Sequence, residues 1–188
     1  PGFLDRPVGV AVAPDGTVVV TEERADRVQR FTVDGTFLGG WGGRGTGPGR
    51  FMSPWDVAVA SDGTVYVVDV DNHRVQRFAP DGTHLGSFGT RGSGAGNLFY
   101  PYGIAVAPDG TLWVADTRGH RVQHFDAGGT YIGGWGGSGI DPGKLSWPIG
   151  VLVTPDGTVV VADYANNRLQ RFGAEGEVLG VWRAPFTN

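Results

Sequence analysis

The sequence repeats itself every 47 residues, and this period constrains the fold more than any other feature. Prolines recur at Pro7, Pro54, Pro101 and Pro148, and Asp-Gly pairs begin at Asp15, Asp62, Asp109 and Asp156. A period of roughly 20 to 50 residues marks a repeat architecture, in which a single unit cannot bury its own apolar face and must stack against its neighbours. We therefore predict one domain over residues 1–188, with units at 7–53, 54–100, 101–147 and 148–188.

Each unit contains the pattern of four short β-strands joined by turns. In the first unit, residues 8–13 and 18–21 flank an Asp-Gly turn, which is a hairpin signal. Residues 27–31 alternate polar and apolar side chains, and a second Asp-Gly turn leads into 37–41. The 34 glycines and 12 prolines disfavour helices. Four strands followed by a Gly-rich crossover such as 42–52 predict one blade of a β-propeller, so we predict an all-β chain of four antiparallel blades.

The third unit resembles an NHL repeat, whose name derives from an Asn-His-Leu motif. The resemblance rests on Pro101 to Val106, Trp113 to Asp116 and His120 to Phe125, and the second unit keeps Asn72-His73. It extends over all four units. The resemblance implies a propeller, usually six-bladed in this family, that serves as a platform for a protein or a ligand. It also implies that a minority of relatives, such as the amidating lyases, are metal-dependent enzymes.

Charge and composition narrow the classes of partner. The net charge of −4 provides no basic stripe, which disfavours binding to nucleic acid. The absence of cysteine excludes disulfides, a thiol nucleophile and thiolate metal sites. No apolar run approaches the length of a membrane span, so we predict no membrane partner. The start at Pro1 predicts a processed or excised chain, and the composition does not indicate a cellular compartment.

A carboxylate precedes a repeat-matched arginine by five residues in every unit. The four pairs are Glu22 and Arg27, Asp69 and Arg74, Asp116 and Arg121, and Asp163 and Arg168. This spacing spans the connection between the second and third strands, and it allows the carboxylate and the guanidinium to meet in a charge-assisted pair. Because a catalytic carboxylate is rarely needed once per blade, we predict that all four are structural ion pairs.

Candidate metal and cofactor motifs have simpler explanations. His73 and His120 share one register, but Asp26 and Asn167 occupy it in the other units, so we predict no metal site. Gly-rich crossovers such as 40–45 satisfy the dinucleotide pattern G-x-G-x-x-G, but no helix follows that could receive the phosphates. No Ser-His-Asp arrangement is present. We predict no cofactor and no catalytic residue.

Differences among the units concentrate on one face of the predicted blades. In an antiparallel blade, the crossovers and the connections between the second and third strands share a face. Around the start of each first strand, this face carries Arg6, Trp55, Asp56, Tyr100, Tyr102 and Trp147. Drift on a tolerant loop explains variation equally well, but large aromatic side chains are typical of binding interfaces. We therefore predict that these six residues bind a ligand around the channel mouth.

We predict a non-enzymatic binding or scaffold module for a protein, a peptide or a small ligand. One alternative is a metal-dependent lyase-like or lactonase-like enzyme, in which Asp56 would be a base or a metal ligand. Another is an excised or engineered set of repeats without a function of its own.

Neither end unit has a polar cap, and Asn188 and Pro1 are consecutive in the period, so ring closure is expected. Either a four-bladed monomer or an eight-bladed head-to-tail homodimer would close the ring, and we favour the dimer.

Overall fold

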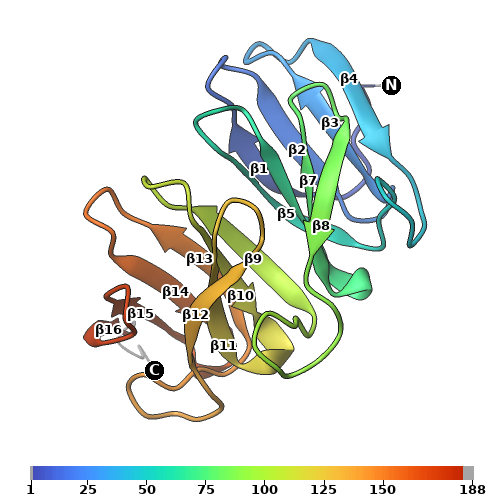
Figure 1. Ribbon diagram of the computed structural model, residues 1–188. Coiled ribbons are helices and arrows are strands. Elements are labelled where there is room, and N and C mark those ends of the chain that lie inside the picture. Colours follow the sequence, from blue (N-terminus) through green and yellow to red (C-terminus); the bar gives the residue numbers. More distant parts are fainter. Residues whose placement is uncertain (1, 184–188) are drawn as a thin grey trace, which may run out of the picture. The chain divides into compact units, whose positions relative to one another are not determined.

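A computed structural model describes residues 2–183, and the predicted succession of Asn188 and Pro1 in the repeat period lies outside the described residues. The described strands form four antiparallel sheets of four strands, and the strand order in each sheet follows the sequence (Figure 1). The all-β fold of four blades is confirmed. The first two blades comprise β1 (Pro7–Val12), β2 (Val18–Glu22), β3 (Arg27–Phe31), β4 (Phe37–Gly42), β5 (Pro54–Val59), β6 (Val65–Asp69), β7 (Arg74–Phe78) and β8 (His84–Phe88).

The third and fourth blades repeat this arrangement at the predicted period. They comprise β9 (Pro101–Val106), β10 (Leu112–Asp116), β11 (Arg121–Phe125), β12 (Tyr131–Gly136), β13 (Pro148–Val153), β14 (Val159–Asp163), β15 (Arg168–Phe172) and β16 (Val178–Trp182). The first strand of each blade begins at its repeat proline, one residue before the start expected from the apolar run. Proline fits this position because the edge of a sheet does not require its missing N–H donor.

The chain divides into two compact units, each with two blades and a core of its own. The first unit extends to Arg91 and the second begins at Gly92. In the first, β1 packs against β5, and in the second, β9 packs against β13. The buried core residues are Val19, Val28, Phe51, Val57, Val65, Val67 and Phe78 in the first unit, and Ala107, Trp113, Val122, Leu145, Val159, Val161 and Phe172 in the second. Small and β-branched side chains dominate because two sheets meet closely here.

The connection between the second and third strands contains a short helical turn that the sequence analysis did not predict. Blades two to four have a 3₁₀ turn here: η1 (Val70–Asn72), η2 (Thr117–Gly119) and η3 (Tyr164–Asn166). Each turn ends in a residue with a left-handed backbone, namely His73, His120 or Asn167. Histidine and asparagine tolerate this conformation better than most side chains. None of the helices within residues 2–183 has the length and apolar character needed to cross a membrane.

Glycine allows the first strands of neighbouring blades to approach closely. A Cβ atom added to Gly103 in β9 would lie 2.6 Å from the carbonyl oxygen of Ile149 in β13. At the matched position of the last blade, a Cβ atom on Gly150 would meet nothing nearer than Ala162, at 3.6 Å. The same repeat position is therefore sterically closed in the third blade and open in the fourth.

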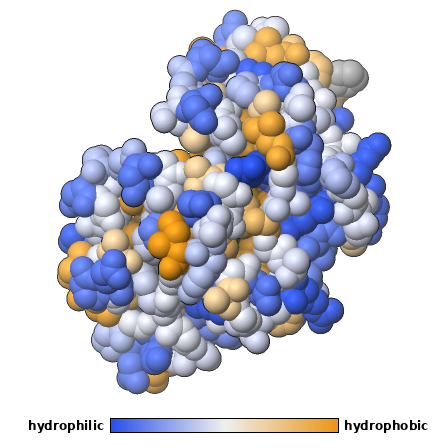
Figure 2. Space-filling view, in the orientation of Figure 1, coloured by the Kyte–Doolittle hydropathy of each residue, from blue (hydrophilic) through white to orange (hydrophobic). Residues whose placement is uncertain are grey.

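The first and last blades expose apolar side chains at positions that are more buried in other blades. On the face shown in Figure 2, apolar residues otherwise form small patches among hydrophilic ones. Val10 and Val12 in β1 are 66% and 68% exposed, whereas Val57, the second-blade counterpart of Val10, is 4% exposed. In the fourth blade, Leu169 and Trp182 are 42% and 48% exposed. The first and last blades thus each present an uncovered apolar face within the described residues.

Candidate functional site

The predicted carboxylate and arginine partners lie next to each other in every blade. The Nε atoms of Arg27, Arg74, Arg121 and Arg168 lie 2.6, 2.8, 2.7 and 2.6 Å from the carboxylate oxygens of Glu22, Asp69, Asp116 and Asp163. All four acid side chains are fully buried. The arginine side chains range from 35% exposed at Arg27 to fully buried at Arg168.

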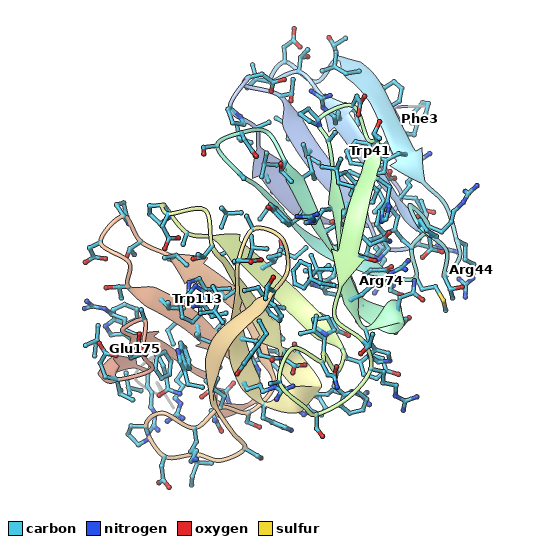
Figure 3. All side chains as sticks on the ribbon, viewed as in Figure 1. Phe3, Trp41, Arg44, Arg74, Trp113 and Glu175 are labelled. Carbon is cyan, nitrogen blue, oxygen red and sulfur yellow. The ribbon has the colours of Figure 1, made fainter. Side chains whose placement is uncertain are left out.

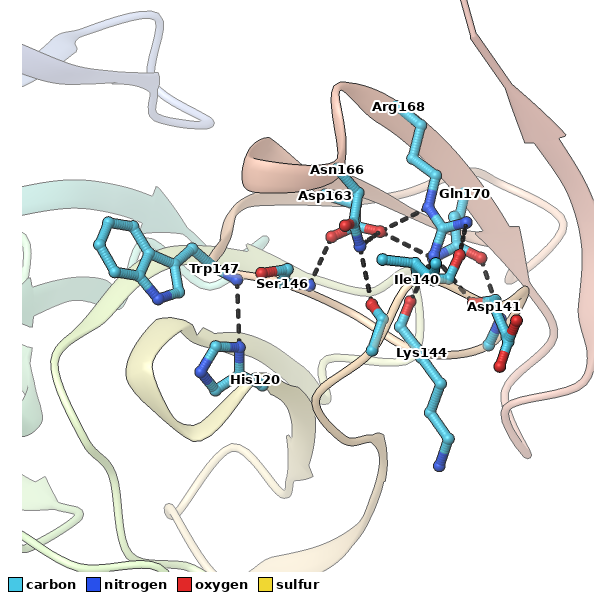
Figure 4. Close-up of polar contacts among 12 residues, drawn as sticks. His120, Ile140, Asp141, Lys144, Ser146, Trp147, Asp163, Asn166, Arg168 and Gln170 are labelled. Carbon is cyan, nitrogen blue, oxygen red and sulfur yellow. Dashed lines mark hydrogen bonds and ion pairs between the residues drawn. The ribbon is translucent and has the colours of Figure 1, made fainter.

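In the fourth blade, the arginine also holds the crossover loop that precedes the blade (Figure 4). Arg168 donates to the backbone carbonyls of Ile140, Asp141 and Lys144 at 2.7, 2.9 and 2.7 Å. A guanidinium has five N–H donors in a planar fork, which is why one side chain can satisfy a carboxylate and three carbonyls together. The ion pair therefore orders a loop more than 20 residues away in sequence.

A glutamine completes each of these networks, and the sequence analysis missed it. Gln170 Nε2 donates to Asp163 Oδ2 at 3.0 Å and to the carbonyl of Lys144 at 2.7 Å, while its Oε1 accepts from the N–H of Gly143 at 3.0 Å. The matched glutamines Gln29, Gln76 and Gln123 make the same three kinds of contact. The signal in the sequence was a glutamine two residues after every repeat-matched arginine.

The same carboxylates position the residue two places before each repeat proline. Asp163 Oδ1 accepts from the N–H of Ser146 at 2.6 Å, and Asp116 Oδ1 accepts from the N–H of Phe99 at 2.6 Å. Asp69 and Glu22 accept from Met52 and Asp5 in the same way. The next residue in each unit is the last before the proline. We call these four the pre-proline residues: Arg6, Ser53, Tyr100 and Trp147.

The pre-proline residues share an unusual backbone conformation. Their φ angles are +56° for Arg6, +56° for Ser53, +49° for Tyr100 and +50° for Trp147. A side chain in this left-handed region costs about 1 kcal/mol, whereas glycine adopts it freely. None of the four is glycine, and all four side chains differ. The blade scaffold therefore holds four different side chains in one strained geometry.

Burial and hydrogen bonds have opposite effects on the pKa values of the buried carboxyl groups. Burial raises the pKa of the Asp69 and Asp116 carboxyls above the ordinary value, against hydrogen bonds that include those from Arg74 and Arg121. At Glu22, burial also acts to raise the pKa, but hydrogen bonds from Arg27, the N–H of Asp5 and Gln29 outweigh it and lower the pKa.

The loop between the second and third strands of one blade contacts the pre-proline residue of the next. Asp26 Oδ1 accepts from the N–H of Ser53 at 2.8 Å, and His120 Nδ1 accepts from the N–H of Trp147 at 3.4 Å. The histidine register considered for metal binding therefore supports the backbone. Within residues 2–183, no group of three or more His, Asp or Glu side chains is placed to hold a metal ion.

In the second unit, one loop contacts two of the predicted site residues. The guanidinium carbon of Arg118 lies 4.5 Å from the ring centroid of Tyr100, and His120 from the same loop contacts Trp147. Trp147 is 48% exposed, and Tyr102 is half-buried on β9. Sequence reasoning missed Arg118, because the matched positions vary among the units, with Arg24, Asp71 and Ala165 in the other three. We refer to Arg118 and the two aromatic residues contacted by its loop, Tyr100 and Trp147, as the aromatic cluster.

The other three predicted site residues belong to the first unit. Arg6 is exposed and lies 3.0 Å from the Glu23 carboxylate. Trp55 is half-buried, and its carbonyl accepts from Thr21 Oγ1 at 2.7 Å. Asp56 Oδ1 accepts from the neighbouring N–H of Val57 at 2.9 Å, so this carboxylate contacts its own backbone. The six predicted residues therefore fall into two sets, one in each unit.

Solved structures with similar folds are propeller proteins of different activities. A streptogramin B lyase matches with a TM-score of 0.72 and 19% identity, over 97% of this chain and 56% of that one. The WD40 repeats of RRP9 match with a TM-score of 0.77 and 17% identity, over 98% and 53%. A nidogen/laminin complex contains a match with a TM-score of 0.72 and 19% identity, over 96% and 65%. The chain thus spans roughly half to two-thirds of the length of these proteins, and at these identities the likeness shows the fold alone.

No curated protein matches the sequence. The family model described as NHL repeat matches at residues 4–31, 51–78, 100–125 and 145–172, which together make up more than half of the chain. These segments contain the repeat proline, the buried carboxylate and the arginine of each blade. The chain therefore belongs to the NHL-repeat family.

Proposed function

We propose that this chain is a non-enzymatic binding module that presents its pre-proline residues to a protein or peptide partner. The observation that carries the proposal is the backbone conformation of these residues. Each holds a side chain at a φ angle near +50°, where glycine would be favoured, and the four side chains are all different. A purely structural position would be expected to repeat with the blade and to use the residue that fits its backbone.

The surroundings of the aromatic cluster support a binding role. Trp147 is 48% exposed, so its indole is available while its backbone is held by the His120 contact and by the network around Asp163. Tyrosine, tryptophan and arginine are the residues that most often dominate the energetics of protein interfaces. A rigidly held aromatic side chain loses little conformational entropy on binding, which favours affinity.

The alternative that the sequence analysis left open is catalysis. One of the solved structures with a similar fold is a lyase, which is an example of an enzyme with this fold. An enzymatic site requires several convergent polar groups. The Asp56 carboxylate, proposed as the base or metal ligand, is instead engaged by the N–H of Val57. We therefore favour binding, and metal analysis of the purified protein distinguishes the two, because stoichiometric bound calcium or zinc would support the enzyme.

Selection of peptides from a random library on the wild-type chain tests the proposal. Selected peptides should bind the Tyr100→Ala and Trp147→Ala variants more weakly by over about 1 kcal/mol per anchor, as expected for interface anchors. Trp55→Ala and Tyr102→Ala should cause the same loss of affinity if Trp55 and Tyr102 also contact the peptide. Tyr131→Ala is the matched control, because Tyr131 is an exposed aromatic of β12 outside this face, 37% exposed.

Melting curves separate binding from folding. Trp147→Ala should melt close to the wild type, since nearly half of its side chain is in solvent. Peptides that bind all the variants equally, or variants that unfold, would show that the aromatic residues serve the core and not a ligand.

A further inference from the structure

Each unit has a cavity between its two blades, on the face opposite the pre-proline residues. The first-unit cavity, about 190 Å³, is lined by Asp15, Arg30 and Pro80 among others. The second-unit cavity, about 290 Å³, is lined by the matched residues Asp109, His124 and Ala174. The two sites are equivalent by the repeat, so one provides a direct comparison for the other.

In the first-unit cavity, an arginine of the chain itself occupies the site. Arg30 Nη2 donates to Asp15 Oδ2 at 3.2 Å and to Thr17 Oγ1 at 3.1 Å, and Nη1 donates to the carbonyl of Pro80. Thr17 Oγ1 also donates to Asp15 Oδ1 at 2.7 Å, which holds the carboxylate in place. Three acceptors from two blades therefore surround one guanidinium.

The second-unit cavity keeps the acceptors but lacks the arginine. Asp109 and Thr111 repeat the geometry, with Thr111 Oγ1 donating to Asp109 Oδ1 at 2.7 Å. Ala174 lines the cavity at the position that matches Pro80. His124 replaces Arg30, and its ring stacks on Trp113 at a centroid distance of 4.0 Å and an interplanar angle of 7°. The second-unit cavity is the larger of the two.

The charges around the second-unit cavity are left unbalanced. Asp109, Asp156 and Glu175 match Asp15, Asp62 and Asp81 of the first unit, whose site contains Arg30. No lysine or arginine is among the described residues that line the second-unit cavity. Glu175 lies in the turn between β15 and β16, and it is labelled in Figure 3 together with Trp113.

His124 does not replace the missing cation. Burial lowers the pKa of its imidazole below 6.5, so the ring is neutral at pH 7, although the charges of Asp109 and Glu175 act in the opposite direction. Its Nε2 atom is buried and has no hydrogen-bond partner among the described residues. A neutral imidazole nitrogen can accept a hydrogen bond from a guanidinium N–H.

We propose that the second-unit cavity binds the arginine side chain of a partner protein, in the place that Arg30 occupies in the first-unit cavity. The guanidinium would donate to Asp109 Oδ2, Thr111 Oγ1 and the carbonyl of Ala174. The geometry favours arginine over lysine, because a planar fork can reach a carboxylate and a carbonyl from two blades at once. This site is separate from the aromatic cluster and does not depend on the proposed function of that cluster.

Titration of the labelled protein with N-acetyl-arginine amide, followed by NMR, tests the proposal. Saturable shifts are expected at the Trp113 indole N–H and the His124 ring, with an affinity in the millimolar range for so small a probe. N-acetyl-citrulline amide, which has the same shape without the charge, and N-acetyl-lysine amide should bind at least tenfold more weakly.

Three variants locate the site. His124→Arg should abolish binding, because it would supply the internal guanidinium seen in the first unit, and Asp109→Asn should weaken binding at least tenfold. Arg30→Ala should vacate the first-unit cavity and raise the stoichiometry from one probe to two. Asp34→Asn, which removes an exposed turn carboxylate outside both cavities, should change nothing. Equal binding of citrulline or lysine, binding that persists in folded His124→Arg or Asp109→Asn, or no saturable binding by the wild type would overturn the proposal.

Discussion

Arg168 Nε donates to Asp163 Oδ2 at 2.6 Å, and both side chains are fully buried. A buried ion pair contributes little net stability compared with an apolar pair, but removing one partner leaves an uncompensated buried charge. In this chain, the pair also satisfies three carbonyls of a crossover loop and positions the residue before Trp147. Its loss should therefore affect both stability and the presentation of Trp147.

We expect Arg168→Leu to lower the free energy of unfolding by about 3 to 5 kcal/mol, as for other broken buried pairs. Arg121→Leu should cost about 1 to 3 kcal/mol, because that arginine is partly exposed. Arg27→Leu should cost least, since Arg27 is 35% exposed. Urea denaturation of the three variants measures the order. Equal midpoints for Arg168→Leu and the wild type would mean that the pair does not stabilise the fold.

Gly103→Ala and Gly150→Ala form a matched pair at one repeat position. In Gly103→Ala, the new Cβ atom would lie 2.6 Å from the carbonyl oxygen of Ile149, so β9 and β13 would have to move apart. We expect this variant to be less stable by about 1 to 3 kcal/mol, as for other overpacked sites. Gly150→Ala has room within a single chain, so in samples dilute enough to be monomeric it should be neutral or stabilise by about 0.5 kcal/mol through the unfolded state. Thermal melts compare them, and similar losses in both would contradict the steric explanation.

The pKa of His124 predicts a dependence of stability on pH. Burial lowers this pKa in the folded state below 6.5, so the unfolded chain binds the proton more readily. The contribution of His124 to stability is therefore complete above pH 6.5, and it is lost as the pH falls through 6.5 to the lowered value. A His124→Gln variant should lose less stability than the wild type between pH 7.5 and about 5.5. An NMR titration that places the pKa of His124 at or above 6.5 would rule this out.

The uncovered faces of the first and last blades predict association. Val10 and Val12, and likewise Leu169 and Trp182, occupy positions whose counterparts pack in other blades. Leaving ~500 Å² of apolar surface in water would forfeit on the order of 12 kcal/mol, comparable to the net stability of a domain. We expect two chains to cover these faces head to tail. Light scattering should then give about 40 kDa, twice the 19.8 kDa of one chain, and a mass of 19.8 kDa would exclude the dimer.

The sequence by itself determined the repeat, the strands and the family. Runs of β-prone residues such as Val18 to Thr21 and Asp-Gly turns extend over a few residues, so their local patterns indicate strands and hairpins without knowledge of the fold. The spacing of five residues between Asp163 and Arg168 was enough to predict partners, because both flank a single connection. Four copies of each signal also separated the repeated structural residues from those that vary.

Only the tertiary structure decided which contacts reach across a blade or between neighbouring blades. Gln170 accepts a hydrogen bond from the N–H of Gly143, which lies 27 residues earlier in the sequence. Trp147, whose backbone is left-handed, donates its N–H to His120 in a loop of the preceding blade. The cavity beside His124 arises because two turns, distant in sequence, converge there. Such contacts depend on how the sheets pack, and a local pattern carries no information about packing at that distance.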